Sequence, residues 1–238
     1  MKKKIYGRNS IIEAIRNHRE LQEVLVTNTN QDIIALLDKN KIKYQVVNKN
    51  IIQEKIQDNV NHQGVMAYTY EYQYAHLEDL ISDEKDSLIV MLDGLEDPHN
   101  LGAIIRTVEI SGAAGIIIPK NRSVRVNATV SKVSAGAIEH VKIVMVTNLV
   151  NTIKILKDHG YWVVGAEALP ESKNFWDVDL KMKTCLIIGS EGQGLSRLTK
   201  EACDFLVKIP MWGKVNSLNA SVSAALLIYE IRRQQNKK

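Results

Sequence analysis

The chain has 238 residues, of which 45% are hydrophobic, and 31 lysines and arginines stand against 27 aspartates and glutamates. These values are those of a globular protein with a sizeable core and one or two domains. They argue against a membrane protein, because no apolar run approaches the roughly 20 residues that span a bilayer. The basic N-terminus lacks the continuous apolar segment of a signal peptide.

The cysteines and histidines indicate neither a disulfide framework nor a metal site. Cys185 and Cys203 lie in apolar segments and form no CxxC pair. We expect both to be reduced, buried thiols, which favours a cytoplasmic location. The six histidines are scattered without metal-ligand spacing, so we predict no metal.

Charge divides the chain into three parts. Residues 1–70 hold 11 basic and 7 acidic side chains, residues 71–87 hold 1 and 6, and residues 88–238 hold 19 and 14. Two mildly basic blocks therefore flank an acidic connector. Mild basicity permits a nucleic-acid partner but does not require one.

The first block alternates short helical and extended patterns. We predict helices at residues 9–17, 31–40 and 50–56, and strands at residues 23–28, 44–48 and 64–70. This pattern predicts a small α/β domain over residues 1–70, followed by an acidic linker over residues 71–87.

The second block, residues 88–238, contains continuous apolar runs of the kind found in buried parallel strands. Six such runs occur, at residues 87–94, 115–119, 141–146, 161–167, 184–191 and 205–211. Helical patterns lie between most of them, such as residues 148–160, which end at Gly160. We therefore predict a mostly parallel six-stranded sheet with helices on both faces. Ligands of such sheets bind beyond the carboxyl ends of the strands.

The first strand-end motif is "EDPHNLGAIIRT" at residues 96–107. Asn100 is a good N-cap, and a helical stripe follows from Leu101 to Val108. Arg106 projects roughly opposite that stripe. It is either a solvated surface arginine or a side chain that faces an anion or a ribose, and His99 is more typical of a loop.

The second motif, "LIIGSEGQGL" at residues 186–195, crowds three glycines behind a strand. Its spacing and its late position do not fit a dinucleotide-binding fingerprint. The glycines either let a ligand approach the backbone or form a plain tight turn. Glu191 is the carboxylate between them.

The third motif is "IPMWGKVNSLNASVSAALLIYE" at residues 209–230. Ser217, Asn219 and Ser221 cannot all cap the helix that follows. That helix is apolar nearly all round, so it lies either in a thick core or against a second subunit. The surplus polar groups would then face something other than bulk water.

In order and spacing, the three motifs together resemble those of the SpoU-type RNA ribose 2′-O-methyltransferases, the TrmH family of the SPOUT superfamily. The resemblance covers the whole second block. The first block looks like the ribosomal-protein-like substrate-binding domain of the RlmB-type 23S rRNA guanosine-2′-O-methyltransferases. The segments "GLEDPHN" and "AGAIEHV" are also similar to that subfamily.

The resemblance implies a knotted α/β fold, S-adenosylmethionine as cofactor, rRNA as substrate and an obligate homodimer. The dimer would be built on the last helix, at Leu227 and Ile228. Positions that match the family's cofactor contacts are Gly189, Ile209 and Leu218. Positions that match its polar active-site set are Asn100, Arg106, Glu191, Ser217 and Asn219.

The residue chemistry adds to the resemblance. The family proposal makes Arg106 the activator of the ribose hydroxyl, but an arginine is a poor base. We favour Arg106 as a hydrogen-bonding partner of the developing alkoxide or a phosphate, with Glu191 or water accepting the proton. Two alternatives stay open: the same reaction on tRNA, and a non-catalytic RNA-binding module.

Overall fold

The computed structural model describes residues 2–57 and 60–236. The chain divides into two compact units. The first unit comprises Met1–Gln73 together with Arg125–His140, which we call the returning segment. The second unit comprises Tyr74–Val124 and Val141–Lys238.

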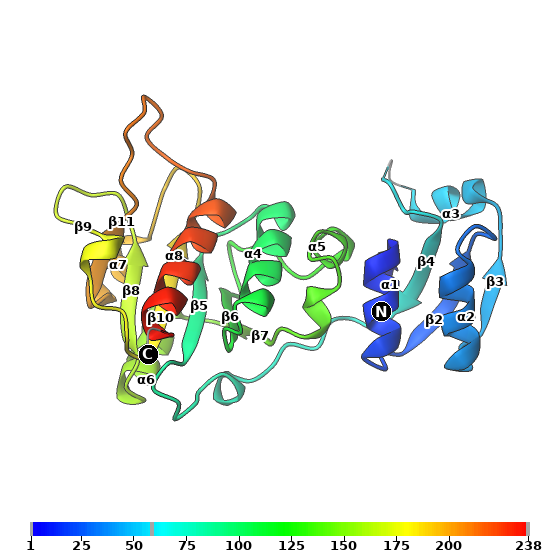
Figure 1. Cartoon of the computed structure of the whole chain (residues 1–238), viewed down its shortest axis with the longest axis horizontal. Coiled ribbons are helices and arrows are strands. Elements are labelled where there is room, and N and C mark those ends of the chain that lie inside the picture. Colours follow the sequence, from blue (N-terminus) through cyan, green and yellow to red (C-terminus); the bar gives the residue numbers. More distant parts are fainter. Residues whose placement is uncertain (1, 58–59, 237–238) are drawn as a thin grey trace. The chain divides into compact units, whose positions relative to one another are not determined.

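The first unit contains a four-stranded sheet (Figure 1). Its elements are β1 (Lys3–Tyr6), α1 (Arg8–Arg16), β2 (Leu21–Val26), α2 (Gln31–Lys39), β3 (Tyr44–Val46), α3 (Lys49–Ile56) and β4 (Val65–Thr69). The returning segment adds α5 (Ala128–Val133) and the 3₁₀ turn η2 (Ala137–Glu139). The strand order is β1-β4-β2-β3, with β2 and β3 parallel and the other pairs antiparallel.

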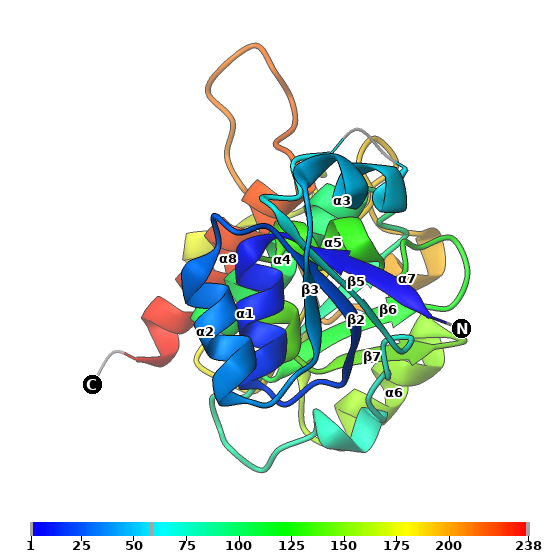
Figure 2. The ribbon, with the colours of Figure 1, turned by 90° about the vertical axis from the view of Figure 1, so that its right-hand side faces the viewer.

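Alternating side chains give this sheet two buried faces. Val24 and Val26 pack with α1 and α2, whereas Leu25 packs with Ile52 and Ile56 of α3. Figure 2 shows α1 and α2 side by side along the sheet. The three predicted helices and three predicted strands of this block are confirmed. Strand β1 was not predicted, because its two lysines leave too few apolar residues for a strand pattern.

The returning segment packs against α1 and the strand β1. The hydroxyl of Ser10 donates to the carbonyl of Ser131 over 3.0 Å, and Asn17 Nδ2 donates to the carbonyl of Glu139 over 2.7 Å. Arg19 forms an ion pair of 2.5 Å with the Glu139 carboxylate. A stretch that sequence alone assigned to the second block thus helps to complete the first unit.

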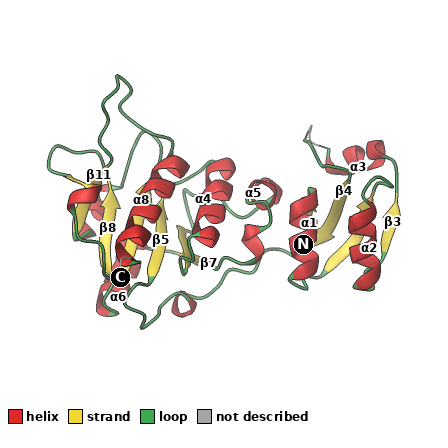
Figure 3. Ribbon diagram, viewed as in Figure 1, coloured by secondary structure: helices red, strands yellow, loops and turns green. Residues whose placement is uncertain are grey.

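The second unit contains a seven-stranded sheet in which every neighbouring pair is parallel (Figure 3). Its strands, in the spatial order β7-β6-β5-β10-β8-β11-β9, are β5 (Leu88–Asp93), β6 (Gly115–Pro119), β7 (Ile143–Val146), β8 (Trp162–Ala166), β9 (Lys173–Asn174), β10 (Thr184–Gly189) and β11 (Phe205–Lys208). All six predicted strands are present. The count of six is wrong, because the two-residue edge strand β9 has no apolar run to reveal it.

Helices cover both faces of the parallel sheet. They are α4 (Pro98–Ile110), α6 (Leu149–Asp158), α7 (Arg197–Ala202) and α8 (Ala220–Gln235), with the 3₁₀ turns η1 (Leu77–Asp79) and η3 (Phe175–Asp177). On one face Ile153 and Leu156 of α6 pack on Ile89 and Met91. On the other, α4 and α8 lie side by side (Figure 1). The predicted layering is confirmed.

Most of the acidic stretch 71–87 belongs to the second unit, which begins at Tyr74. Ala75 forms a bridge with Val144 of β7, and Leu80 is buried against the α6 face of the sheet.

Within the described residues no helix is both long enough and apolar enough to cross a membrane.

Candidate active site

The glycine-rich loop after β10 closes as a tight turn at the carboxyl edge of the parallel sheet. Ser190 and Gly194 exchange two backbone hydrogen bonds, of 3.2 and 3.0 Å. Gly194 has φ +66°, in the left-handed region that favours glycine. A Cβ on Gly189 would lie 2.3 Å from the carbonyl carbon of Gly194. These two glycines therefore serve the turn, which presents Glu191 at its tip.

Glu167, just beyond the end of β8, holds this turn in place. Its carboxylate accepts from the backbone N–H of Leu195 over 2.8 Å and from Lys200 Nζ over 3.1 Å. Glu167 was not among the predicted site residues. Its position could have indicated a role, since a carboxylate directly after an apolar strand lies at the ligand-binding edge of a parallel sheet.

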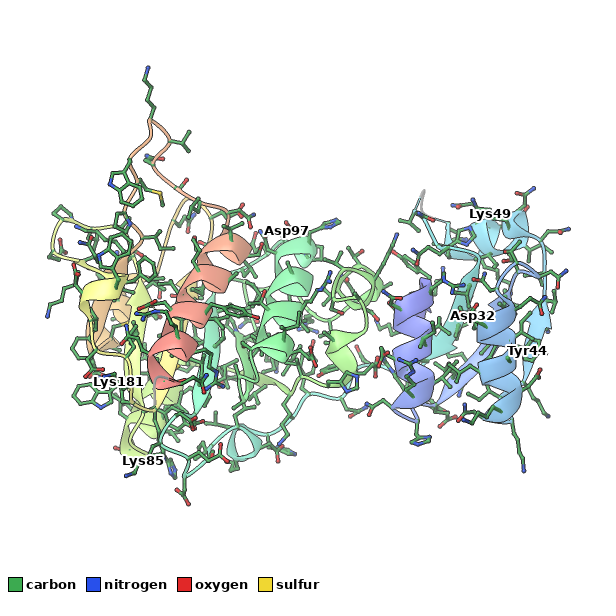
Figure 4. All side chains as sticks on the ribbon, viewed as in Figure 1. Asp32, Tyr44, Lys49, Lys85, Asp97 and Lys181 are labelled. Atoms are coloured by element: carbon green, nitrogen blue, oxygen red, sulfur yellow. The ribbon has the colours of Figure 1, made fainter. Side chains whose placement is uncertain are left out.

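The start of α4 corrects one prediction. The N-cap is Asp97, whose Oδ1 accepts from the backbone N–H of His99 over 2.9 Å, and not Asn100. The reason is Pro98, because proline favours the first helical position and so places the cap one residue before it. Figure 4 labels Asp97 at the start of α4. Asn100 lies inside the first turn, where its amide is free of capping and is 5% exposed.

Asn100, Glu191 and Asn219 form one hydrogen-bonded network. Asn219 Nδ2 donates to Asn100 Oδ1 over 2.8 Å and to Glu191 Oε1 over 2.7 Å. Asn100 Nδ2 also donates to Glu191 Oε1, over 2.9 Å. The backbone N–H of Ala220 is a third donor to this oxygen, at 3.2 Å. The network joins the starts of α4 and α8 to the glycine-rich loop.

Asn219 also answers the question of the surplus polar groups before α8. Its Oδ1 caps the helix by accepting from the backbone N–H groups of Ser221 and Val222. Its Nδ2 is left to bind Asn100 and Glu191. One side chain thus caps the helix and orients the carboxylate.

A cavity of about 440 Å³ opens beside the network. Apolar side chains from the ends of β8, β10 and β11 line it, together with a polar rim. All three predicted cofactor positions, Gly189, Ile209 and Leu218, lie in its wall, as do Glu191, Ser217 and Asn219. The loop between β11 and α8, which carries several of these residues, projects from the unit (Figures 1 and 2).

Asn100 joins the network without lining this cavity, whereas Arg106 neither lines the cavity nor joins the network. Leu101, Ile104, Ile105 and Val108 are fully buried, and Arg106 lies on the exposed side of α4. In the part of the chain that the structure describes, its guanidinium has no hydrogen bond or ion pair. The predicted orientation is confirmed, but within one chain Arg106 and the network are separate.

The two cysteine thiols are protonated. Burial raises the pKa of the Cys203 thiol to about 12, and it also raises the pKa of Cys185. Neither is a thiolate near neutral pH. Across residues 2–57 and 60–236, no three His, Cys, Asp or Glu side chains gather as a metal-binding group.

Comparison with known proteins decides the family. Residues 87–229 match the SpoU rRNA Methylase family, and residues 4–75 match the RNA 2′-O ribose methyltransferase substrate-binding domain. The chain belongs to the SpoU methylase family. The first unit therefore carries the family's substrate-binding domain, and the second carries its methylase domain.

Relatives of this SpoU methylase cover nearly its whole length. A TrmH family tRNA/rRNA methyltransferase of Staphylococcus saprophyticus is 47% identical over 241 residues, covering 98% of this chain and 96% of that protein. An AdoMet-bound rRNA methyltransferase from Sinorhizobium meliloti has a TM-score of 0.82 at 25% identity, covering 98% and 87%. A TrmH/SpoU tRNA-modifying enzyme from A. aeolicus has a TM-score of 0.60 at 31% identity, covering 68% and 81%.

The SpoU methylase family uses S-adenosylmethionine, and the 440 Å³ cavity fits that cofactor. Ligand cavities are typically about 300–1,000 Å³ and combine apolar walls with a few placed polar groups. Here Ile188, Ile209 and Leu218 contribute apolar surface to the wall, and Glu191 and Ser217 contribute polar groups.

Proposed function

We propose that this protein methylates the ribose 2′-hydroxyl of a guanosine in 23S rRNA. The family and its cofactor already make it an S-adenosylmethionine-dependent RNA methyltransferase. The observation that carries the proposed hydroxyl chemistry is the Asn100–Glu191–Asn219 network, of which Glu191 and Asn219 line a cofactor-sized cavity. Chemistry at a hydroxyl needs a positioned proton acceptor beside the methyl donor.

Bound S-adenosylmethionine supplies an electrophilic methyl group, and the residues of the network handle the hydroxyl. Glu191 Oε1 is held by three N–H donors, which fixes the carboxylate plane. Among the described residues no donor binds Oε2. We assign that oxygen to accept the ribose proton, directly or through one water, because it is both oriented and available. Ser217 and Asn100 would position the ribose.

A homodimer on the α4–α8 face is part of the proposal. Val222, Leu226 and Tyr229 form an exposed stripe along α8, and Ile110 is exposed on the adjacent α4. Exposed apolar residues that gather on one side of a helix are typical of an interaction site. The structure corrects which residues would carry it, because Leu227 and Ile228 are buried in the core of their own chain.

The dimer would also bring Arg106 to an active site, that of the partner subunit. Arg106 and Ile110 are four residues apart, so they share the exposed side of α4. At an interface on this side, the guanidinium would point toward the partner subunit. We propose that it reaches the target ribose or phosphate bound there, as a hydrogen-bonding partner of the developing alkoxide.

To test the dimer, Leu226, which is 44% exposed, is replaced by glutamate. Sedimentation should give the mass of a single chain with the fold retained. The matched control is Ile155→Glu on α6, which is 43% exposed on the opposite face and should leave the dimer intact. A Leu226→Glu protein that sediments as the parent does would place the interface elsewhere.

The first unit supports rRNA over tRNA. The rRNA methyltransferase from S. meliloti aligns with 98% of this chain, whereas the A. aeolicus tRNA-modifying enzyme aligns with 68%. We propose residues 1–70 as the RNA-binding domain, residues 71–87 as the linker and residues 88–238 as the methyltransferase domain.

The proposal also includes a cytoplasmic location, supported by two free cysteines with protonated thiols.

We include a trefoil knot in the proposal. The glycine-rich loop and the β11–α8 loop, which are separated in the chain by α7 and β11, share the wall of one cavity. The start of α8 is bound to Glu191 of the glycine-rich loop. This convergence of separate loops on one cofactor site supports a knotted crossing of the chain.

The decisive experiment uses labelled S-adenosylmethionine with separated large-subunit rRNA, small-subunit rRNA and tRNA. Label should enter the large-subunit rRNA, and mapping should place it on the ribose of one guanosine. Incorporation of label into tRNA alone would contradict the rRNA proposal and identify tRNA as the substrate. RNA binding without label would favour a non-catalytic module.

A further inference from the structure

A second cavity, of about 560 Å³, adjoins the one that fits the cofactor. It lies over the carboxyl ends of β5 and β6. Ser190, Glu191 and Gly194 line both cavities, so the glycine-rich loop is their common wall. Asn100, whose amide is bound to Glu191, faces the second cavity.

The geometry points to this second cavity as the pocket for the target nucleoside, with Glu96 as the residue that selects guanine. This inference rests on the proposed function. Methyl transfer needs the methyl donor and the accepting hydroxyl to be held side by side, and here two adjoining cavities share Glu191 in their walls. If one holds the methyl donor, a ribose in the other has its hydroxyl beside the network.

The lining of the second cavity is rich in hydrogen-bond acceptors. Most of its carboxylates are engaged: Asp93 Oδ2 accepts from the backbone N–H of Ser196, Asp97 caps α4, and Glu191 belongs to the network. Glu96 is exposed and, among the described residues, has no hydrogen-bond or ion-pair partner. Both of its carboxylate oxygens are therefore open to a ligand.

Guanine is the base that such a carboxylate recognises best. Its Watson–Crick edge presents the N1–H and the 2-amino group side by side, and these two donors match the two oxygens of one carboxylate. Adenine, cytosine and uracil do not present two adjacent donors on that edge. Unpaired bases of RNA are commonly read on this edge, since they can be turned out of the helix into a pocket.

Arg122 gives the second cavity a cation for the RNA backbone. It follows β6 in a left-handed conformation, with φ +54°, in which its carbonyl lies beside Gly94. Its side chain is exposed and lines the cavity opposite the start of α4. An arginine at the rim suits the phosphate that flanks the target nucleotide.

The test compares guanine with hypoxanthine, which keeps N1–H but lacks the 2-amino group. The mapped target guanosine of the rRNA is replaced by inosine in a ligated transcript. The parent protein should methylate the inosine RNA about tenfold less efficiently in kcat/KM, as expected for half of a bidentate contact. In Glu96→Ala the penalty for inosine should vanish, with cofactor affinity by calorimetry unchanged.

Asp158→Ala is the control, because Asp158 is an exposed carboxylate at the end of α6, on the opposite edge of the sheet. It should keep the full inosine penalty. Equal rates on both RNAs with the parent protein, or a full penalty in Glu96→Ala, would overturn the inference while methylation of rRNA still stood. Absence of any RNA methylation by the parent protein would instead refute the proposed function itself.

Discussion

Each unit of the molecule contains a polar network that joins distant parts of the sequence, and the two networks differ in charge balance. In the first unit Arg19 pairs with Glu139, 120 residues away, and the two side chains are 18% and 6% exposed. In the second unit the described donors to Glu191 are all amide N–H groups, and a cavity opens beside it. The first network neutralises its charges internally, as structural pairs do. The second network leaves its carboxylate without a cation and available to a ligand. We therefore interpret the first network as structural and the second as functional.

The largest effect is expected at the carboxylate that has no cation. Glu191→Gln keeps an oxygen that can accept from Asn100, Asn219 and the backbone of Ala220, but it removes the charge and the basic oxygen. Methyl transfer to rRNA should fall by about 10²–10⁴-fold, the usual contribution of a positioned base. The melting temperature should stay near that of the parent. Activity within threefold of the parent would show that Glu191 only shapes the loop.

Arg106 should be the cation that the second network lacks within its own chain. Arg106→Lys keeps the positive charge but loses the planar fork of donors. We expect methyl transfer to fall about 10²-fold, with cofactor affinity and stability unchanged because Arg106 is exposed.

Arg106→Ala sharpens this second test. If charge alone matters, the lysine variant should retain most activity and the alanine variant should lose it. If both variants methylate normally, Arg106 is a solvated surface residue and its catalytic assignment is wrong.

The network of the first unit should respond in stability and not in catalysis. Arg19→Ala leaves the Glu139 carboxylate, which is 6% exposed, without its cation. The free energy of unfolding should drop by about 3 kcal/mol in urea titrations. The control is Arg16→Ala, because Arg16 is exposed and its partner Glu13 keeps a second partner in His140, with a change of about 0.5 kcal/mol. A smaller loss for Arg19 than for Arg16 would contradict the comparison.

The smallest expected effect is on stability at Asn219, which both caps α8 and donates to Glu191. Asn219→Asp keeps a capping oxygen but replaces the amide donor with an oxygen that faces Glu191. We expect a loss of about 2 kcal/mol in the free energy of unfolding, since hydrogen bonds to a charged group are lost. Asn148 caps α6 through a bond of 3.0 Å to the backbone N–H of Asn151. Asn148→Asp should therefore change stability by less than about 0.5 kcal/mol, and an equal loss at both positions would mean that only capping matters.

Sequence patterns predicted those parts of the fold that depend on local periodicity. Six strands followed from apolar runs, and the exposed side of α4 followed from the stripe that begins at Leu101. The short strands β1 and β9 escaped, because their pairing depends on neighbours and not on their own composition.

The site itself was predicted in part. Asn219, Glu191 and Asn100 were found through motif resemblance, but their mutual hydrogen bonds depend on how three loops meet in space. The capping role of Asn100 was wrong because the proline beside it shifts the helix start. Which apolar side of α8 is exposed was also unpredictable, since buried Leu227 and exposed Leu226 are adjacent residues of the same type.

The returning segment has a consequence for the order of folding. Val130 and Ile138 are buried in the first unit, although His140 lies 124 positions after Arg16, the last residue of α1. During synthesis at about 5–20 residues per second, α1 and β1 therefore emerge roughly 6–25 seconds before the segment that covers them is complete. Until then the face of α1 around Ser10 is open to water or to other chains. The RNA-binding unit, although it is made first, therefore cannot finish folding until more than half of the protein has been translated.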